Sequence, residues 1–127
     1  MPVVLDASAV LAFVRGEKGA DRVLPHIGNA ITSSVNLQEV VKEMALVDMT
    51  SEQIRKVLDD LRLDVRPHDE NAAYVAGMLV LQTKQYCRGL GDRTCIGLGL
   101  ELNLPVLTAN QEWKRVEIEG LKLEHIR

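Results

Sequence analysis

Three consecutive apolar residues, Val3–Leu5, followed at once by Asp6, constrain the fold more than any other stretch of the chain. The run has no polar alternation, as expected of a strand that is covered on both faces in a parallel sheet. Asp6 follows the carboxyl end of this strand, where open α/β sheets place their ligand sites. Two roles are therefore open for Asp6: a carboxylate placed for chemistry, or the N-cap of a helix that begins at Ala7.

Strand-like and helix-like segments alternate along the rest of the chain. This alternation predicts an α/β fold in which helices cover both faces of a central parallel sheet. The further strands are expected at residues 30–33, 63–66, 105–108 and 121–126. The helices are expected at residues 7–14, 19–27, 35–47, 50–62, 69–83 and 92–102, with a turn or short helix at residues 110–116.

Residues that favour helix N-termini mark several of these helix starts. Ser34 is the expected N-cap of the helix at residues 35–47, and Thr50 with Gln53 forms a capping-box pattern. Asp69 is expected to cap the helix that runs to residue 83. Because that helix is apolar nearly all round, we expect it to be buried against more than one layer, one of which could be a second subunit.

Length, composition and charge restrict the class of protein. A chain of 127 residues is expected to form one domain, residues 1–127. No apolar run approaches the roughly 20 residues of a membrane span, and the N-terminus does not resemble a secretion signal, so a cytoplasmic protein is expected. The net charge of −3 argues against tight, sequence-independent nucleic-acid binding, but it allows an enzyme with carboxylates around a metal ion.

The cysteines and histidines do not form a recognisable metal or redox motif. Cys87 and Cys95 are spaced neither as a redox pair nor as a zinc knuckle, and we expect both to be packing thiols. The three histidines are scattered along the chain, so a zinc site is not expected.

Four polar residues are expected to meet at one edge of the sheet. Asp6 and Asn110 each follow a predicted strand, Glu39 lies early in the helix after the second strand, and Asp92 begins a later helix. Several carboxylates in one cleft need a counter-charge to stay ionised. Oxygen ligands favour Mg²⁺ or Mn²⁺, and such ions assist phosphodiester hydrolysis, so the sequence favours a metal-dependent phosphodiesterase.

Four linked motifs resemble the PIN-domain family across nearly the whole chain. They are VVLDASAVLA at residues 3–12, SSVNLQEV at 33–40, HDENAAYVAGML at 68–79 and LGDRTCIGLGLELNLPVLTAN at 90–110. Among PIN domains the similarity is closest to the VapC-type toxins of prokaryotic toxin–antitoxin pairs.

The resemblance implies a PIN-like three-layer α/β/α sandwich with metal-dependent endoribonuclease activity on RNA. Asp6, Glu39 and Asp92 match the family's acidic residues, which hold Mg²⁺ or Mn²⁺ and position the attacking water. VapC-type proteins also form homodimers and are silenced by a VapB-type antitoxin, so both partners are expected here.

The resemblance also implies roles for polar residues around the carboxylates. Ser8 would support Asp6 by hydrogen bonding, Asn36 would orient Glu39 or a metal-bound water, and Thr108 would act in a similar supporting way. The chain departs from the family at Asn110, where an Asp is common. Since an amide brings no charge, we expect one strong metal site and a second that forms only with substrate phosphate.

Basic side chains near the expected site are candidates for RNA contacts. Arg93, directly after Asp92, is the leading candidate for a phosphate contact, with a surface ion pair as the alternative. The other candidates are Arg15, Lys84 and Arg88. Aromatic residues make up only 3% of the chain, so Phe13 and Trp113 are expected to pack rather than to stack on bases.

Other proteins that begin with a strand ending in Asp fit less well. A haloacid-dehalogenase phosphatase needs a second Asp two residues after the first, where this chain has Ser8. A receiver domain needs a phosphoacceptor Asp after the third strand, where Pro67 and His68 stand. The serious alternative is a PIN scaffold that binds RNA or a protein without cutting, and Asn110 is the residue that motivates it.

Overall fold

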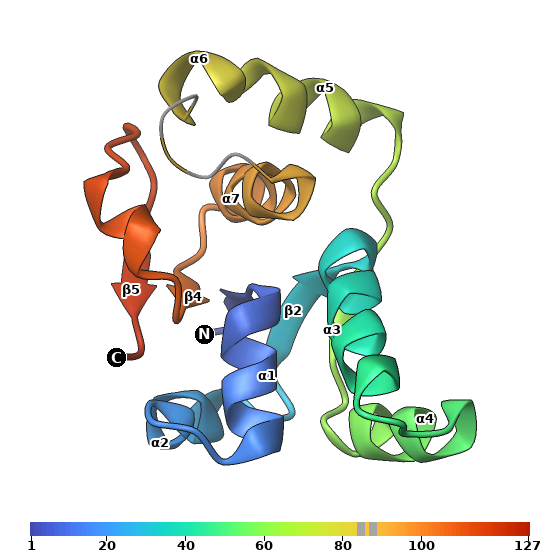
Figure 1. Ribbon diagram of the computed structural model, residues 1–127. Helices are drawn as coiled ribbons and strands as arrows, with labels where there is room; N and C mark the ends of the chain where they lie inside the picture. Colours follow the sequence, from blue (N-terminus) through green and yellow to red (C-terminus); the bar gives the residue numbers. More distant parts are fainter. Residues whose placement is uncertain (84–85, 87–88) are drawn as a thin grey trace.

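The computed structural model describes residues 1–83, 86 and 89–127 (Figure 1). The predictions made for Lys84, Cys87 and Arg88 therefore lie outside the described residues.

Five parallel strands form the central sheet, in the order β3-β2-β1-β4-β5. The strand β1 lies in the middle, and its Val4 pairs with Ile31 on one side and Val106 on the other. This arrangement confirms the predicted parallel sheet. The strands are β1 (Val3–Leu5), β2 (Ala30–Ser33), β3 (Asp64–Arg66), β4 (Val106–Thr108) and β5 (Leu123–His125).

Helices cover both faces of the sheet, which confirms the three-layer α/β/α architecture. In Figure 1, α1 to α4 lie toward one face, α7 lies against the other, and α5 and α6 lie outside α7. The α-helices are α1 (Ala7–Arg15), α2 (Ala20–Val23), α3 (Ser34–Leu46), α4 (Ser51–Asp60), α5 (Glu70–Met78), α6 (Val80–Thr83) and α7 (Leu90–Leu102). Two 3-10 helices, η1 (Leu24–His26) and η2 (Gln111–Arg115), follow α2 and β4.

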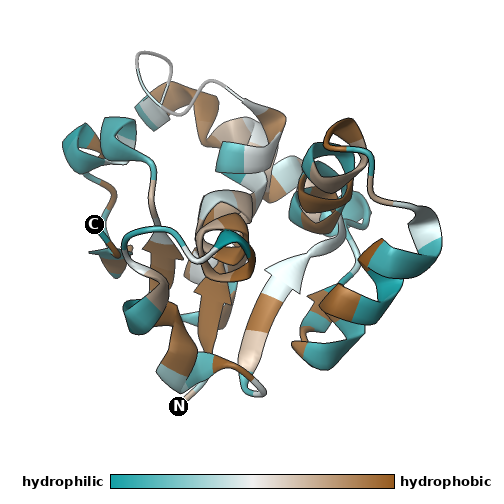
Figure 2. Ribbon diagram, turned by 60° about the horizontal axis from the view of Figure 1, so that its bottom comes forward, coloured by the Kyte–Doolittle hydropathy of each residue, from teal (hydrophilic) through white to brown (hydrophobic). Residues whose placement is uncertain are grey.

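Alternate residues of β1 belong to two separate hydrophobic clusters. Val3 and Leu5 pack among the helices α1 to α4, whereas Val4 packs with Ile96 of α7 and with Trp113. All three β1 side chains are buried because helices cover both faces, which explains the absence of polar alternation in the sequence. Figure 2 shows the hydrophobic colouring concentrated on these central strands, while much of α4 is hydrophilic.

The helices differ from the predictions at three places. The N-cap of α3 is Ser33 rather than Ser34, and its hydroxyl accepts a hydrogen bond from the Asn36 N–H. The last helix begins at Leu90, which makes Asp92 its third residue. The helix predicted at residues 19–27 is a single turn, α2, followed by η1, which contains Pro25. Proline lacks the N–H that a continued α-helix requires.

The predicted helix at residues 69–83 is also corrected. It is interrupted at Leu79, which separates α5 from α6, and α7 is its main neighbour within the chain. The opposite side is open to solvent: the exposed fractions are 71% for Tyr74, 63% for Met78 and 71% for Leu81. The expected burial against more than one layer is thus not achieved by this chain alone.

Several packing predictions are confirmed. Trp113 and Cys95 are fully buried in the cluster on the α7 side of the sheet. On α4, the sequence also leads us to expect Asp59 and Asp60 on a solvated face, and both are exposed. Among the described residues, no helix combines the length and the apolar character that crossing a membrane requires.

The close packing of α7 on β4 depends on Gly99. A Cβ added to this residue would lie 2.2 Å from Cγ2 of Val106, which is fully buried. Gly77 on α5 is different, because a Cβ added there would meet nothing within 4 Å. The two glycines therefore make a matched pair of sites for the same substitution.

We expect Gly99→Ala to lower the free energy of unfolding by about 1–3 kcal/mol, because the added methyl group overpacks the core. Gly77→Ala should raise it by about 0.5–1 kcal/mol, since alanine is the better helix former. Urea unfolding of both variants measures the difference. Equal effects at the two sites would contradict this account of the packing.

Candidate active site

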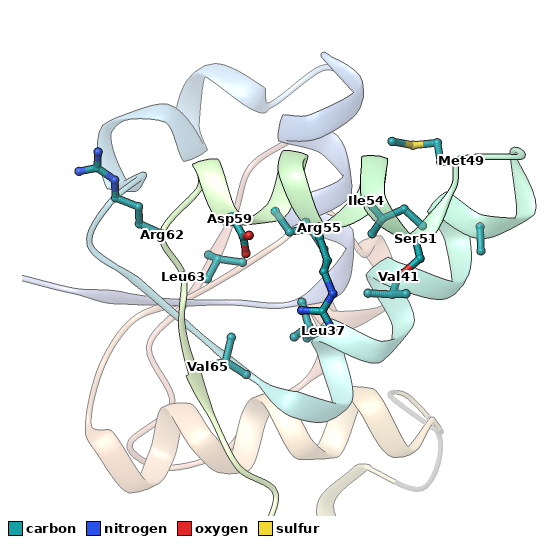
Figure 3. Close-up of a pocket in the computed structure, with 12 residues that line it drawn as sticks. Leu37, Val41, Met49, Ser51, Ile54, Arg55, Asp59, Arg62, Leu63 and Val65 are labelled. Carbon is teal, nitrogen blue, oxygen red and sulfur yellow. The ribbon is translucent and has the colours of Figure 1, made fainter.

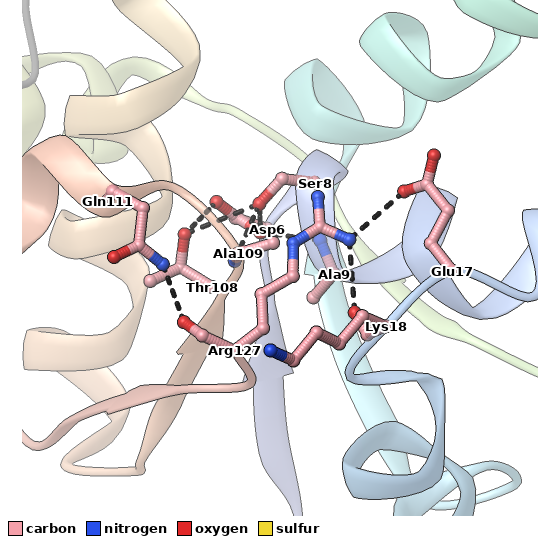
Figure 4. Close-up of polar contacts among 9 residues, drawn as sticks. All are labelled: Asp6, Ser8, Ala9, Glu17, Lys18, Thr108, Ala109, Gln111 and Arg127. Carbon is pink, nitrogen blue, oxygen red and sulfur yellow. Dashed lines mark hydrogen bonds and ion pairs between the residues drawn. The ribbon is translucent and has the colours of Figure 1, made fainter.

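The Asp6 carboxylate lies buried between the first strand and the first helix, with an exposed fraction of only 4% for the residue. Its Oδ1 accepts hydrogen bonds from the Ala9 N–H at 2.9 Å and from the Ser8 hydroxyl at 2.7 Å. Its Oδ2 accepts one from the Thr108 hydroxyl at 2.6 Å (Figure 4). Asp6 therefore caps α1, and it is also tied to β4, which is far away in sequence.

The hydroxyl groups of Ser8 and Thr108 are both committed to this carboxylate. Each donates its proton to Asp6, and each accepts a backbone N–H in turn, from Ala109 at 2.9 Å and from Asn110 at 3.0 Å. The two hydroxyl oxygens lie 3.3 Å apart (Figure 4). The carboxylate is thus held in a fixed orientation by groups that are themselves fixed.

Burial raises the pKa of the Asp6 carboxyl from 3.8 to about 6, even though three hydrogen bonds to the carboxylate oppose the shift. The negative charge of Asp92 contributes to this rise in pKa. The hydrogen bonds therefore do not fully offset the cost of burying the negative charge of Asp6. A cation bound next to the carboxylate would stabilise this charge.

Glu39 is held beside the N-terminus of α7. The Asn36 side chain donates one hydrogen bond to Glu39 Oε1 at 3.2 Å and another to the Gly91 carbonyl oxygen at 3.1 Å. Asn36 itself is buried, and its Oδ1 accepts the Ser33 hydroxyl proton. Partial burial raises the pKa of Glu39, and repulsion from Asp92 adds to that shift.

Asp92 lies in the first turn of α7, where it accepts a hydrogen bond from the Gly89 N–H at 3.3 Å. Partial burial raises the pKa of its carboxyl, while the Gly89 N–H, the Trp113 side chain and the charge of Arg93 favour the ionised form. The Trp113 Nε1 is buried and makes no hydrogen bond of good geometry with the described residues. The indole N–H nevertheless points its positive end close enough to Asp92 to lower the pKa of that carboxyl.

The three predicted carboxylates therefore come from separate elements to one region. Asp92 acts electrostatically on both Asp6 and Glu39 and raises the pKa of each. Within the described residues, however, no three Asp, Glu, His or Cys side chains are close enough to form a ready metal cluster.

The donor chemistry nevertheless fits a hard divalent cation. A carboxylate has about four lone-pair positions, and the three hydrogen bonds to Asp6 leave one of them on Oδ2. Mutual repulsion among the carboxylates is the force that such a cation offsets, and oxygen donors suit Mg²⁺ or Mn²⁺. The residues that would hold it are Asp6, Asp92 and Glu39.

The remaining predicted residues have different roles, and not all of them lie near the carboxylates. The Asn110 Oδ1 accepts the Glu112 N–H at 3.0 Å, so this side chain caps η2. Arg93 is close enough to Asp92 to lower its pKa. Arg15 is the last residue of α1 and lies at the opposite end of that helix from Asp6. Its Nη2 is 3.9 Å from Oε1 of Glu43, and both side chains are partly exposed.

A sequence model of the PIN domain matches residues 3–119. The chain belongs to the PIN domain family. No curated protein matches this PIN domain by sequence.

Several solved structures of similar fold come from toxin–antitoxin complexes. A chain of VapBC2 from Rickettsia felis, bound to a promoter DNA fragment, has 22% identity and a TM-score of 0.72, with 98% of each chain covered. A chain of DNA-bound VapBC from Salmonella typhimurium has 21% identity and a TM-score of 0.74, covering 100% of this PIN domain and 99% of its own length. A chain of VapBC-1 from Haemophilus influenzae has 23% identity and a TM-score of 0.71, with 99% and 98% covered.

Sequence reasoning missed two residues of the site, Gly91 and the indole of Trp113. Gly91 stands against Glu39, which is distant in sequence, so no local pattern indicated this contact. Trp113 was expected only to pack, and nothing in its spacing indicates that its N–H lies near Asp92.

An apolar groove lies apart from the carboxylates, between α3, α4 and β3 (Figure 3). Its volume is about 420 Å³, and Arg55, Asp59 and Arg62 stand among its lining side chains. The apolar lining includes Leu37, Val41, Met49, Ile54, Leu58, Leu63 and Val65. None of the three candidate carboxylates lines this groove.

The buried charge of Asp6 predicts a pH-dependent stability. Because the folded pKa of about 6 exceeds the unfolded value of 3.8, the folded state binds the proton more tightly and is destabilised as pH rises from 4 to 6. In the presence of a chelator, replacing Asp6 with Asn removes this effect. The stability of Asp6→Asn relative to wild type should rise by up to about 3 kcal/mol between pH 4 and pH 7.

Urea unfolding at several pH values measures this difference. Asp60→Asn, which changes an exposed carboxylate at the end of α4, controls for the loss of one negative charge. A stability difference that stays constant from pH 4 to pH 7 would show that burial of Asp6 does not shift its pKa.

Proposed function

We propose that the chain is a Mg²⁺- or Mn²⁺-dependent endoribonuclease and the toxin of a VapBC-type toxin–antitoxin pair. The observation that carries the proposal is the convergence of Asp6, Glu39 and Asp92, from three separate elements, within electrostatic reach of one another. Membership of the PIN domain family and the fold shared with chains of VapBC complexes support it.

Each residue of the site has a defined part in this chemistry. Ser8 and Thr108 fix the Asp6 carboxylate, and Asn36 fixes that of Glu39. When bound, the divalent cation supplies an activated water and stabilises the charge on phosphoryl oxygens. Arg93, next to Asp92, offers a positive charge to an RNA phosphate.

A PIN scaffold that binds RNA or a protein without cutting is the second candidate function. Two observations favour it: the Asn110 side chain is engaged in capping η2, and the described carboxylates do not form a ready three-residue metal cluster. Cleavage assays with and without metal separate the two candidates.

The proposal includes a VapB-type antitoxin as a protein partner. Several solved structures of the same fold are VapBC complexes. The chain offers apolar surface to a protein partner in the groove between α3 and α4.

It also includes a homodimer formed through the helices α5 and α6. Tyr74, Met78 and Leu81 expose apolar surface on the side of these helices that faces away from the sheet. Burial of such surface against a second copy would remove it from water.

Cleavage of a mixed single-stranded RNA tests the activity. We expect cutting with Mn²⁺ or Mg²⁺, none with chelator, and a rate at least about 100-fold lower in Asp6→Asn and Asp92→Asn, because each variant removes a metal-binding charge. Mn²⁺ should also raise the melting temperature of wild type more than that of either variant, since a ligand stabilises the state that binds it.

Asp60→Asn, far from the site on α4, is the control and should cut as fast as wild type. Wild-type protein that does not cut under any metal condition, or Asp6→Asn and Asp92→Asn variants that cut normally, would overturn the nuclease proposal. RNA binding without cutting would then favour the scaffold.

Substitution on the open side of α6 tests the dimer. Leu81→Glu should weaken self-association by about tenfold or more, because it places a charge in the proposed apolar interface. Leu46→Glu is the matched control, since Leu46 on α3 is also 71% exposed. Sedimentation measures both, and a wild-type protein that is monomeric at micromolar concentration would contradict the proposal.

A further inference from the structure

The Glu39 carboxylate occupies the space that a side chain at position 91 would fill. A Cβ added to Gly91 would lie 1.6 Å from Glu39 Oε1, 2.6 Å from its Cδ and 3.1 Å from Oε2. No other glycine of the described chain would bring a Cβ so close to another atom. A residue with a Cβ at position 91 is therefore incompatible with the observed position of Glu39.

The backbone at Gly91 does not itself require glycine. The residue lies in the first turn of α7, and it is not among the glycines with positive φ. At an ordinary helical position, glycine makes a helix less stable than alanine does. The contact with Glu39, rather than the local conformation, is what gives glycine a role here.

Asn36 holds the same contact from the other side. Its Nδ2 donates to both Glu39 Oε1 and the Gly91 carbonyl oxygen, so one buried amide joins the α3 carboxylate to the first turn of α7. This places Glu39 at the N-terminus of a 13-residue helix, where backbone N–H groups favour negative charge. It also places Glu39 next to the turn that carries Asp92.

We propose that Gly91 is a positioning residue for Glu39: its missing side chain lets the Glu39 carboxylate lie against the first turn of α7, beside Asp92. The inference rests on the proposed nuclease function for its catalytic consequence. Any side chain at this position pushes the carboxylate away from α7, while the helix itself can accept alanine.

Gly91→Ala tests the proposal through activity. We expect kcat for RNA cleavage with Mn²⁺ to fall by about 10- to 100-fold with little change in KM, because a misplaced carboxylate impairs the chemical step. Asp60→Asn on α4, away from the carboxylates and from the proposed dimer surface, is the control and should cut as wild type does. Unchanged kcat in Gly91→Ala would overturn the proposal.

A double-mutant cycle with Glu39→Ala separates positioning from a general structural role. If Gly91 acts through Glu39, Gly91→Ala should cause no further loss of cleavage in the Glu39→Ala background. An equal fold-loss in both backgrounds would mean that the methyl group disturbs α7 itself, and the proposal would fail.

The melting temperature in chelator gives a readout that does not depend on catalysis. With Glu39 removed, Gly91→Ala should raise the melting temperature by about 2–4 °C, because alanine is the better helix former. With Glu39 present, the rise should be smaller, because the displaced carboxylate loses its hydrogen bond from Asn36. An equal change in melting temperature with and without Glu39 would show that Gly91 does not act through Glu39, and the proposal would fail. If wild-type protein does not cleave RNA at all, only the proposed nuclease function is overturned.

Discussion

Burial of the Asp6 carboxylate is the interaction on which the rest of the site depends. Removing a charged group from water is unfavourable, and here hydrogen bonds from Ala9, Ser8 and Thr108 oppose that effect without cancelling it. The donors come from α1 and from β4. The carboxylate can therefore be held only when the central strands and the first helix are already in place.

The helix α7 links the packed interior to the site. Its C-terminal half lies on β4 at a distance that Gly99 makes possible, and its first turn carries Asp92 and receives Glu39. Gly99 and Gly91 both matter because they have no side chain, but each makes room for a different neighbour. Gly99 admits a buried apolar side chain, whereas Gly91 admits a carboxylate.

The sequence predicted the parallel sheet well, and the expected approach of the carboxylates is reflected in the charge of Asp92, which raises the pKa of both Asp6 and Glu39. The strand at Val3–Leu5 was predicted correctly because a strand that is covered on both faces has apolar residues at every position. The choice of Ser33 over Ser34 as a cap could not be predicted, because both residues have a suitable hydroxyl and only the direction of the incoming strand decides. The contact between Gly91 and Glu39 could not be predicted for a related reason: the two residues are distant in sequence, and no local pattern indicates that they meet.

Trp113 is the only tryptophan of the chain, and it is fully buried next to Asp92 with its indole N–H unpaired among the described groups. Indole emission depends on nearby charge and on solvent. The protein therefore contains a single built-in optical probe at the first turn of α7. Its fluorescence can follow events at the carboxylates without a label, an added chromophore or any change to the chain.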